Sequence, residues 1–360
     1  MRRTASVLLL LLALTTSAWA QQTWYVAKTG DDGNAGSAAA PFLTIAKAIS
    51  MASTSAIDEI IVGPGTYQEN LTINKNLKLL SSAGLSQTTI EGSQSSALLG
   101  TVVVSTGSNG VVIGDVNQGF KIIGIDGPPG LEKSAIYLQG THTNMIVRGN
   151  ELVANGDEAF MSEYNAAVTY ITIDANIISG QTYTGSNPAG DGFGEQQWIL
   201  ANVPRQLVVM GGGSSGTNTQ HITFTNNTIT GTAGGYNTSN QEQGNTLVTI
   251  DAENSTITGN TFAGTTTRGA ASLRCRRPNT TISSNTFTST NLTPSCVHFT
   301  LMNATVSQTL INANTFDKGV YVIGGSEVGL SIQAAIDVVP AGTVINVTPG
   351  TYAESLIITK

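Results

Sequence analysis

A single residue type recurs through the second half of this chain at a spacing that few folds accommodate. Six similar segments, RGNEL, DANII, TNNTI, TGNTF, SSNTF and NANTF, each carry one asparagine at the same place, namely Asn150, Asn176, Asn227, Asn260, Asn285 and Asn314. The gaps between them are 26, 51, 33, 25 and 29 residues. The longest gap is about two periods, and the apolar run 207–210 inside it is a candidate for the missing turn. Internal periods of this length are typical of solenoids.

The residues around each asparagine alternate in polarity as a β-strand does. Counted from the asparagine, position −3 is always apolar: Val147, Ile173, Phe224, Ile257, Ile282 and Ile311. Position +2 is apolar as well: Leu152, Ile178, Ile229, Phe262, Phe287 and Phe316. Positions −4 and −2 are mostly polar, which gives the period of two that predicts a strand with one buried face. The spacings of three and four that an α-helix needs are missing.

Strands that recur in this way must be connected, and the type of connection decides the fold. The Asn-Gly or Asp-Gly pairs that would close a hairpin at each period are missing, so a parallel coil is the economical solution. We expect each asparagine to lie at a bend between two strands of one turn, tolerating a left-handed backbone. Its amide would bond to the asparagine of the next turn. This structural interpretation is favoured over a catalytic role for these residues.

The N-terminal part of the chain predicts a short helix. Phe42, Ile45, Ala46 and Ile49 recur at helical spacing just after Pro41. We expect this amphipathic helix to precede the first strand, residues 59–62, and to plug the open end of the coil. In that position it would cover unpaired strand edges and core side chains that otherwise invite aggregation.

Composition excludes several classes of protein. Only 11% of the residues are charged, against roughly a quarter in average soluble domains, and 40 are glycine, which argues against a helical or coiled-coil protein. The formal net charge is −7, and removal of the two arginines of the N-terminal leader described next makes it −9. Nucleic-acid binding needs a broad basic surface, so we expect no nucleic-acid partner.

Residues 1–20 have the pattern of a secretory signal peptide. Arg2 and Arg3 precede an apolar run at 7–14, and Ala-Trp-Ala at 18–20 supplies the small residues of a cleavage site. No other apolar stretch is long enough to span a bilayer. We therefore expect a secreted or cell-surface protein that does not cross the membrane.

The two cysteines leave their pairing open. Cys275 and Cys296 lie 21 residues apart, and an oxidising compartment permits a disulfide between them. Two buried thiols are an equally good interpretation, because cysteine is also a common core residue.

Two longer stretches carry a resemblance to a known family. TWYVAKTGDDGNAGSAAAPFLTIAKAI, followed by IIVGPGTYQENLTI, resembles the opening of right-handed parallel β-helix proteins of the pectate-lyase-like superfamily, particularly secreted bacterial members of unassigned function. The asparagine-containing turns look like the later coils of those proteins. The resemblance implies an all-β chain, a right-handed three-sheet parallel β-helix over residues 21–320 with an N-terminal capping helix.

A second copy of this opening begins near the C-terminus. VTPGTYAESLIITK at 347–360 matches VGPGTYQENLTINK at 62–75 with a constant offset of 285 residues. Residues 321–360 are therefore predicted to start a second, incomplete β-helix repeat. One turn cannot bury its own core, because repeat units need neighbours. We expect the chain to be a fragment of a longer protein, or this turn to stack on the preceding helix or on further β-helix domains.

The basic residues are the first candidates for function. Lyases with this fold cleave uronic-acid polymers by β-elimination, using a cation and a basic residue. For Arg148, a surface ion pair with Asp174 is favoured over a catalytic role. Arg274, Arg276 and Arg277 form the densest basic cluster, with Arg268 in the loop just before it, and this cluster is a candidate dock for an anionic glycan. The alternative is a solvated face in which Asp251 pairs with Arg276.

Two further groups are weaker candidates. Residues 180–205 interrupt the repeat and carry Tyr183, Trp198 and Arg205, which are suited to sugar binding in a loop, although an idle loop is as good an interpretation. Asp157 and Glu158 belong to an acidic group that would suit Ca²⁺, but their spacing matches no dedicated calcium loop. No catalytic residue is assigned.

These observations support two functions from different classes. The first is a secreted β-helix that binds, and cleaves by β-elimination, an extracellular and anionic polysaccharide, with Ca²⁺ as the candidate cofactor. The second is a non-catalytic adhesin or structural spacer built of tandem β-helices, which the duplicated opening favours.

Overall fold

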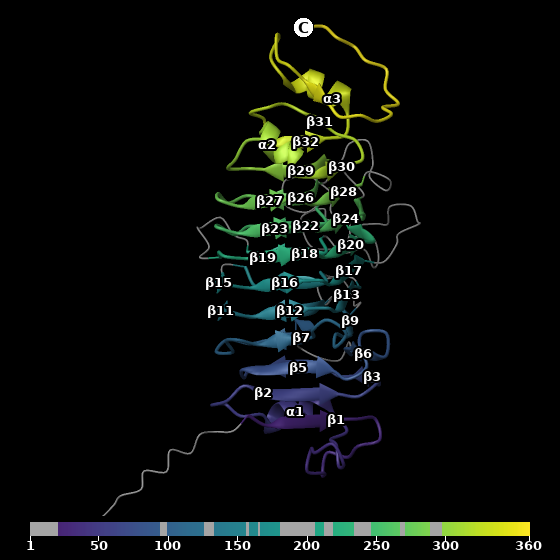
Figure 1. Cartoon of the computed structure of the whole chain (residues 1–360), viewed down its shortest axis with the longest axis vertical. Coiled ribbons are helices and arrows are strands. Elements are labelled where there is room, and N and C mark those ends of the chain that lie inside the picture. Colours follow the sequence, from purple (N-terminus) through teal and green to yellow (C-terminus); the bar gives the residue numbers. More distant parts are fainter. Residues whose placement is uncertain are drawn as a thin grey trace, which may run out of the picture.

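Each turn of the chain adds one strand to each of three parallel sheets that surround a common axis (Figure 1). The computed structural model describes residues 21–93, 99–125, 133–155, 158–164, 166–180, 206–211, 219–233, 246–266, 271–288 and 297–360. The chain is a right-handed three-sheet parallel β-helix, as predicted.

The three sheets are called A, B and C here in the order in which the chain meets them. Sheet A contains β1 Thr23–Val26, β2 Asp58–Val62, β5 Leu77–Ser81, β8 Val112–Ile113, β12 Ile146–Arg148, β16 Thr172–Asp174, β19 Thr223–Thr225, β23 Thr256–Thr258 and β27 Thr281–Ser283. Sheet B contains β3 Gly65–Gln68, β6 Thr88–Glu91, β9 Lys121–Ile123, β13 Glu151–Ala154, β17 Ile177–Gly180, β20 Thr228–Thr230, β24 Thr261–Phe262, β28 Thr286–Phe287 and β30 Thr315–Phe316.

Sheet C is the longest and continues to the C-terminal part. Its strands are β4 Leu71–Ile73, β7 Gly100–Val104, β10 Ser134–Leu138, β14 Phe160–Ser162, β18 Val208–Met210, β22 Val248–Ile250, β26 Ala271–Cys275, β29 Val297–Leu301, β32 Glu327–Gly329, β31 Val320–Tyr321 and β33 Asn346–Val347. The last three pair antiparallel. Two short pairs complete the strands, β11 His142–Thr143 with β15 Val168–Thr169, and β21 Thr232–Ala233 with β25 Thr265–Thr266.

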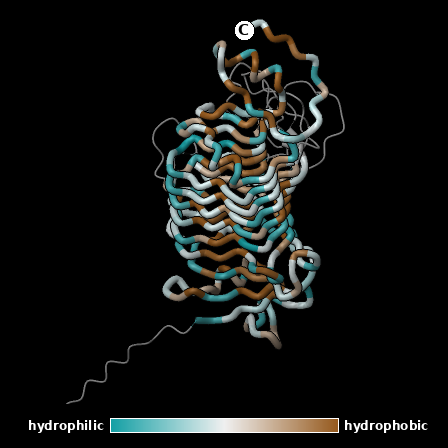
Figure 2. The backbone as a smooth tube through the Cα atoms, turned by 45° about the horizontal axis from the view of Figure 1, so that its top comes forward, coloured by the Kyte–Doolittle hydropathy of each residue, from teal (hydrophilic) through white to brown (hydrophobic). Residues whose placement is uncertain are grey.

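The predicted core positions line the interior. All residues at positions −3 and +2 from the ladder asparagines are buried except Phe316, which is partly buried. In sheet B the rings of Phe262, Phe287 and Phe316 stack at centroid distances of 4.7 and 5.2 Å. Figure 2 shows apolar and polar residues alternating along the stacked coils. The prediction of a missing turn at 207–210 is wrong, because β16 pairs directly with β19 and β17 with β20, so the 51-residue gap is a single coil. The run 207–210 contributes β18, the strand that this coil adds to sheet C between β14 and β22.

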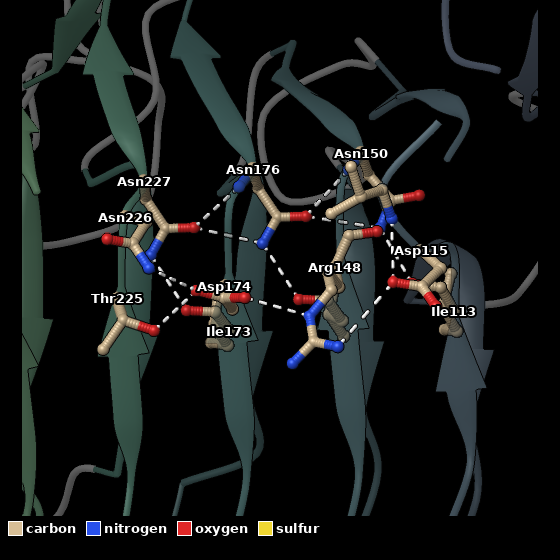
Figure 3. A network of polar contacts seen from close by, with 12 residues as sticks. Ile113, Asp115, Arg148, Asn150, Ile173, Asp174, Asn176, Thr225, Asn226 and Asn227 are labelled. Atoms are coloured by element: carbon tan, nitrogen blue, oxygen red, sulfur yellow. Dashed lines mark hydrogen bonds and ion pairs between the residues drawn. The ribbon is translucent and has the colours of Figure 1, made fainter. Parts of the chain in front are cut away.

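The asparagines form a continuous ladder along the axis. Asn150 donates its main-chain N–H to Oδ1 of Asn176 at 3.0 Å, and Asn176 donates in the same way to Asn227. The steps to Asn260, Asn285 and Asn314 repeat this bond. Each Nδ2 group also donates to a main-chain carbonyl, such as that of Ile173 from Asn227 (Figure 3). The side-chain amide therefore satisfies buried main-chain groups at every bend.

The expectation that the asparagine itself adopts the left-handed conformation is wrong. The residue immediately before it does so in five turns: Gly149, Ala175, Asn226, Gly259 and Ser284, with φ between 54° and 73°. One left-handed residue is enough to redirect the chain, and this leaves the asparagine side chain free to point inward. The sixth repeat differs again, because Ile311 lies in a helix, α2 Gln308–Asn312, for which Ser307 is the N-cap.

The predicted N-terminal helix is α1 Ile45–Met51, with Thr44 as its N-cap. It packs against β1, β2 and β4, and Ile45, Ala48 and Ile49 join the main core. Two details of the prediction are wrong. Ala46 is exposed, and the strand at 59–62 is not the first, because β1 precedes the helix and pairs with β2. A third helix, α3 Ile332–Val338, lies near the other end. Among the described residues, every helix is too short or too polar to cross a membrane.

Candidate functional site on the outer face of sheet C

The outer face of sheet C carries two of the arginines that the sequence singled out. The strand register places one outward side chain from each coil in a single line, which we call the outer row: Val103, Tyr137, Met161, Val209, Thr249, Arg274 and Thr300. Apart from Ser162, a buried polar residue, the chain neighbours of these members belong to the main core. The first four members form a separate buried apolar cluster. The outer row is therefore apolar over the early coils and polar over the later ones.

Arg274 does not lie on the solvated face that we considered as the alternative to a dock. It is only 7% exposed, and it takes part in an interaction within the chain. Of its two neighbours in the outer row, Thr249 is buried and Thr300 is partly buried. Cys275 points into the core, as strand alternation predicted. Burial and the nearby Asp251 carboxylate raise the pKa of the Cys275 thiol, so this thiol is a core group rather than a nucleophile.

Beside the outer row lies the ion pair that the aligned repeats predicted. Arg276 Nε donates to Asp251 Oδ2 at 2.7 Å, and a second guanidinium nitrogen bonds to the same oxygen. The Asp251 side chain is 3% exposed and that of Arg276 is 28% exposed. Asp251 Oδ1 is buried and has no hydrogen-bond partner in the part of the chain that the structure describes. Such a buried acceptor is unusual and typical of sites that bind a further group.

The other predicted arginine, Arg148, belongs to a surface network on sheet A. Its Nε donates to Asp174 Oδ2 at 2.9 Å, and Asp115 lies on its other side (Figure 3). Thr225 and Asn226 donate to the second oxygen of Asp174. Burial acts to raise the pKa of Asp174, but these hydrogen bonds and the Arg148 charge outweigh it and lower the pKa. The structural interpretation of Arg148 is supported, since every member already has partners.

Several candidates lie outside the described residues: Tyr183, Trp198, Arg205, Arg268, Asp157 and Cys296. In the sequence, 181–205 directly precedes β18, and 267–270 directly precedes β26, so both segments lead into sheet C. Arg274 lies in β26, and Arg276 is the residue directly after this strand, so the two arginines lie close together.

The calcium candidates have one described member, Glu158. It is 1% exposed, and its Oε2 atom has no hydrogen-bond partner among the described residues. The described ranges contain no group of three or more His, Cys, Asp or Glu that could hold a metal. Because Ca²⁺ takes six to eight oxygen ligands, Glu158 alone does not make a calcium site.

Two features of this face escaped the sequence analysis. Lys133, directly before β10, is only 5% exposed, and burial lowers its pKa. The segment GPPGLEKSAIY around it matches none of the repeats, so no pattern marked it. The apolar cluster of Val103, Tyr137, Met161 and Val209 was also missed. Its signal was available, because outward strand positions that are apolar in four successive coils differ from the threonine-rich outward positions of sheet A.

Comparisons with known proteins gave one family match and several solved structures of low sequence identity. Residues 28–111 match a family described as "Protein of unknown function (DUF1565)". A search of curated proteins found no match. Among solved structures, pectin methylesterase from carrot is 12% identical with a TM-score of 0.46, covering 84% of this chain and 82% of that chain.

Two further solved structures extend this likeness. Pectin methylesterase PemA from Erwinia chrysanthemi is 13% identical with a TM-score of 0.40, over 82% of this chain and 93% of that one. Alginate lyase from a Paenibacillus species is 12% identical with a TM-score of 0.33, over 76% of this chain and 94% of that one. At these identities the likeness concerns the fold of this β-helix alone.

Proposed function

We propose that this β-helix is an exported protein that binds an extracellular, anionic polysaccharide on the outer face of sheet C. The observation that carries the proposal is the partly exposed Arg276, paired with a buried Asp251 carboxylate of which one oxygen is unbonded in the described structure, in a chain with a net charge of −7. Guanidinium groups pair with carboxylates through two parallel hydrogen bonds.

Three further points support the proposal. The leader at 1–20 has the pattern of a signal peptide, which places the protein where such polymers occur. Tyr183, Trp198, Arg205 and Arg268 belong to segments that lead into sheet C in the sequence. The structural neighbours named above are, by their descriptions, pectin methylesterases and an alginate lyase.

Cleavage by β-elimination is the finer part of the proposal. It requires neutralisation of the uronic carboxylate and removal of the adjacent proton by a base. Arg276 is suited to the first task, because it is partly exposed. A chain cleaved in this way acquires an unsaturated uronide, whose ultraviolet absorbance appears as the reaction proceeds.

The experiment measures retention on immobilised pectate, alginate and glycosaminoglycans, with and without Ca²⁺. Replacement of the partly exposed Arg276 by Gln should reduce affinity by about tenfold or more, since a charged contact contributes about 1.5–3 kcal/mol. Arg148→Gln is the matched control, because it removes an arginine from sheet A, and it should bind like the parent. Equal binding by the Arg276 variant and the parent would overturn the dock, and no absorbance with any polymer would overturn the cleavage.

A second function is favoured by a separate observation, the repeated opening at residues 347–360. A non-catalytic adhesin or spacer of tandem β-helices needs successive starts of this type. It predicts no product from any polymer and a length that grows with the number of β-helix units.

A further inference from the structure

The two copies of the opening sequence hold their helices through the same contacts. In the first copy, the Glu69 carboxylate accepts hydrogen bonds from the main-chain N–H groups of Ile45 and Ala46, at the start of α1. In the second copy, the Glu354 carboxylate accepts from Ile332 and Gln333, at the start of α3. All four bonds measure 2.9 Å, so each carboxylate fastens its helix at the same place.

The last residue of each copy fastens the opposite end of its helix. Lys75 Nζ donates to the carbonyls of Ile49, Ser50 and Ala52, at the end of α1. Lys360 Nζ donates to the carbonyls of Asp337 and Val339, at the end of α3. A cation at this position satisfies the orphan carbonyls that every helix leaves at its C-terminal end.

The aliphatic residues of the two copies nevertheless differ in burial. Leu71 and Ile73 are 0% exposed, whereas their equivalents Leu356 and Ile358 are 44% and 70% exposed. Val338, in α3, is 80% exposed. Large apolar side chains grouped on one surface are typical of an interaction site.

The first copy shows which kind of strand covers the equivalent aliphatic residues. Leu71 and Ile73 in β4 pair with Val102 and Val104 of β7, which belongs to the next coil. Among the described residues, no strand pairs with 356–358, and β33 pairs only with β31. An open cavity of about 310 Å³ lies where the core would continue, lined by Ile336, Ile345, Val347, Leu356 and Ile358 among others.

We propose that this end of the molecule, the yellow part of Figure 1, is a docking surface for the first full coil of an adjoining parallel β-helix domain. The coil supplies a strand that runs parallel to 356–358 and carries aliphatic side chains at alternate positions, as β7 does over β4. A second copy of this chain does not fit in the same way, because α1 already covers the first coil of its N-terminal end. The proposal does not depend on polysaccharide binding.

The test uses the full chain with a second copy of residues 76–125 appended after Lys360. In the first copy this sequence follows Lys75 and supplies β5 to β9. If the surface accepts a coil, the appended segment should be cleaved by a protease about tenfold more slowly than a scrambled segment of the same composition. Equal rates would overturn the proposal.

Two variants of the surface complete the test. Leu356→Asp together with Ile358→Asp should raise the cleavage rate of the appended segment to that of the scrambled one. In the chain without the appendage, the same pair should leave the melting temperature unchanged, because both side chains are exposed. A dimer of the unextended chain that Ile358→Asp dissolves would place a second copy on this surface and overturn the proposal.

Discussion

The molecule contains two arginine–aspartate pairs that form between neighbouring coils in the same way. They differ in how completely the aspartate is hydrogen-bonded. In both, the partners come from neighbouring coils, which parallel pairing places side by side: Arg148 with Asp174 in sheet A, and Asp251 with Arg276 beside sheet C. Asp174 has a partner for each oxygen, whereas one oxygen of Asp251 is buried and unbonded in the described structure.

The difference shows how a solenoid separates structure from function. On sheet A, threonine and asparagine from the following coil complete the network around Asp174. Beside sheet C, the buried Asp251 carboxylate pairs with the partly exposed Arg276 and keeps one oxygen unbonded in the described structure. Because each coil repeats the same backbone, only the outward side chains distinguish a closed network from a surface that can accept a ligand.

The largest expected effect comes from breaking the pair on sheet C. Arg276→Ala leaves the buried Asp251 carboxylate without its cation and should lower the free energy of unfolding by about 3 kcal/mol. Removal of one partner of a buried ion pair costs about 3–5 kcal/mol. We expect the low end of this range because Arg276 is 28% exposed. Arg148→Ala should cost less than about 1 kcal/mol, since that pair is closer to solvent. Urea unfolding followed by circular dichroism measures both, and equal losses would erase the distinction between the pairs.

A smaller effect should appear in ligand binding. Asp251→Asn removes the charge that neutralises Arg276 and keeps the shape of the side chain, so it should strengthen binding of an anionic polysaccharide by about threefold to tenfold. Asp174→Asn is the matched control on sheet A and should leave binding unchanged. Isothermal titration with a uronic-acid oligomer checks this. Weaker binding by the Asp251 variant would mean that the carboxylate itself contacts the sugar, contrary to the proposed dock.

Much of the fold could be predicted because its cause is periodic. The apolar residues at −3 and +2 from each asparagine indicate one buried face per strand, and the asparagine itself indicates the bend. The left-handed residue before the asparagine was misassigned, because glycine, alanine, asparagine and serine all occupy that position and no single residue type marks it. Helix α2 in the sixth repeat was not predicted, because its N-cap, Ser307, lies within an otherwise strand-like pattern.

The candidate site was less predictable because it depends on which outward side chains are covered. Alternation correctly placed Cys275 inward and paired Asp251 with Arg276. It carried no information on how much water reaches the outer face, and so Arg274 was expected in solvent or in a dock and is instead 7% exposed. Burial of an outward position is set by packing between distant segments, which a local pattern does not encode.

The smallest expected effect is on the stability of the protein at acidic pH. It tests the ion-pair network of Asp174 on sheet A. Hydrogen bonds from Thr225 and Asn226 and the charge of Arg148 outweigh burial and lower the pKa of Asp174 from its ordinary value of 3.8. A carboxyl group whose pKa is lower in the folded chain stabilises that chain above its ordinary pKa, and the stabilisation is lost as the pH falls through the folded value. The parent should therefore exceed Asp174→Asn in stability by less than about 1 kcal/mol near neutral pH, and the gap should close below pH 3.8. Urea midpoints of both proteins across this range measure the gap, and a gap that stays constant with pH would mean that the network does not depend on the charge of Asp174.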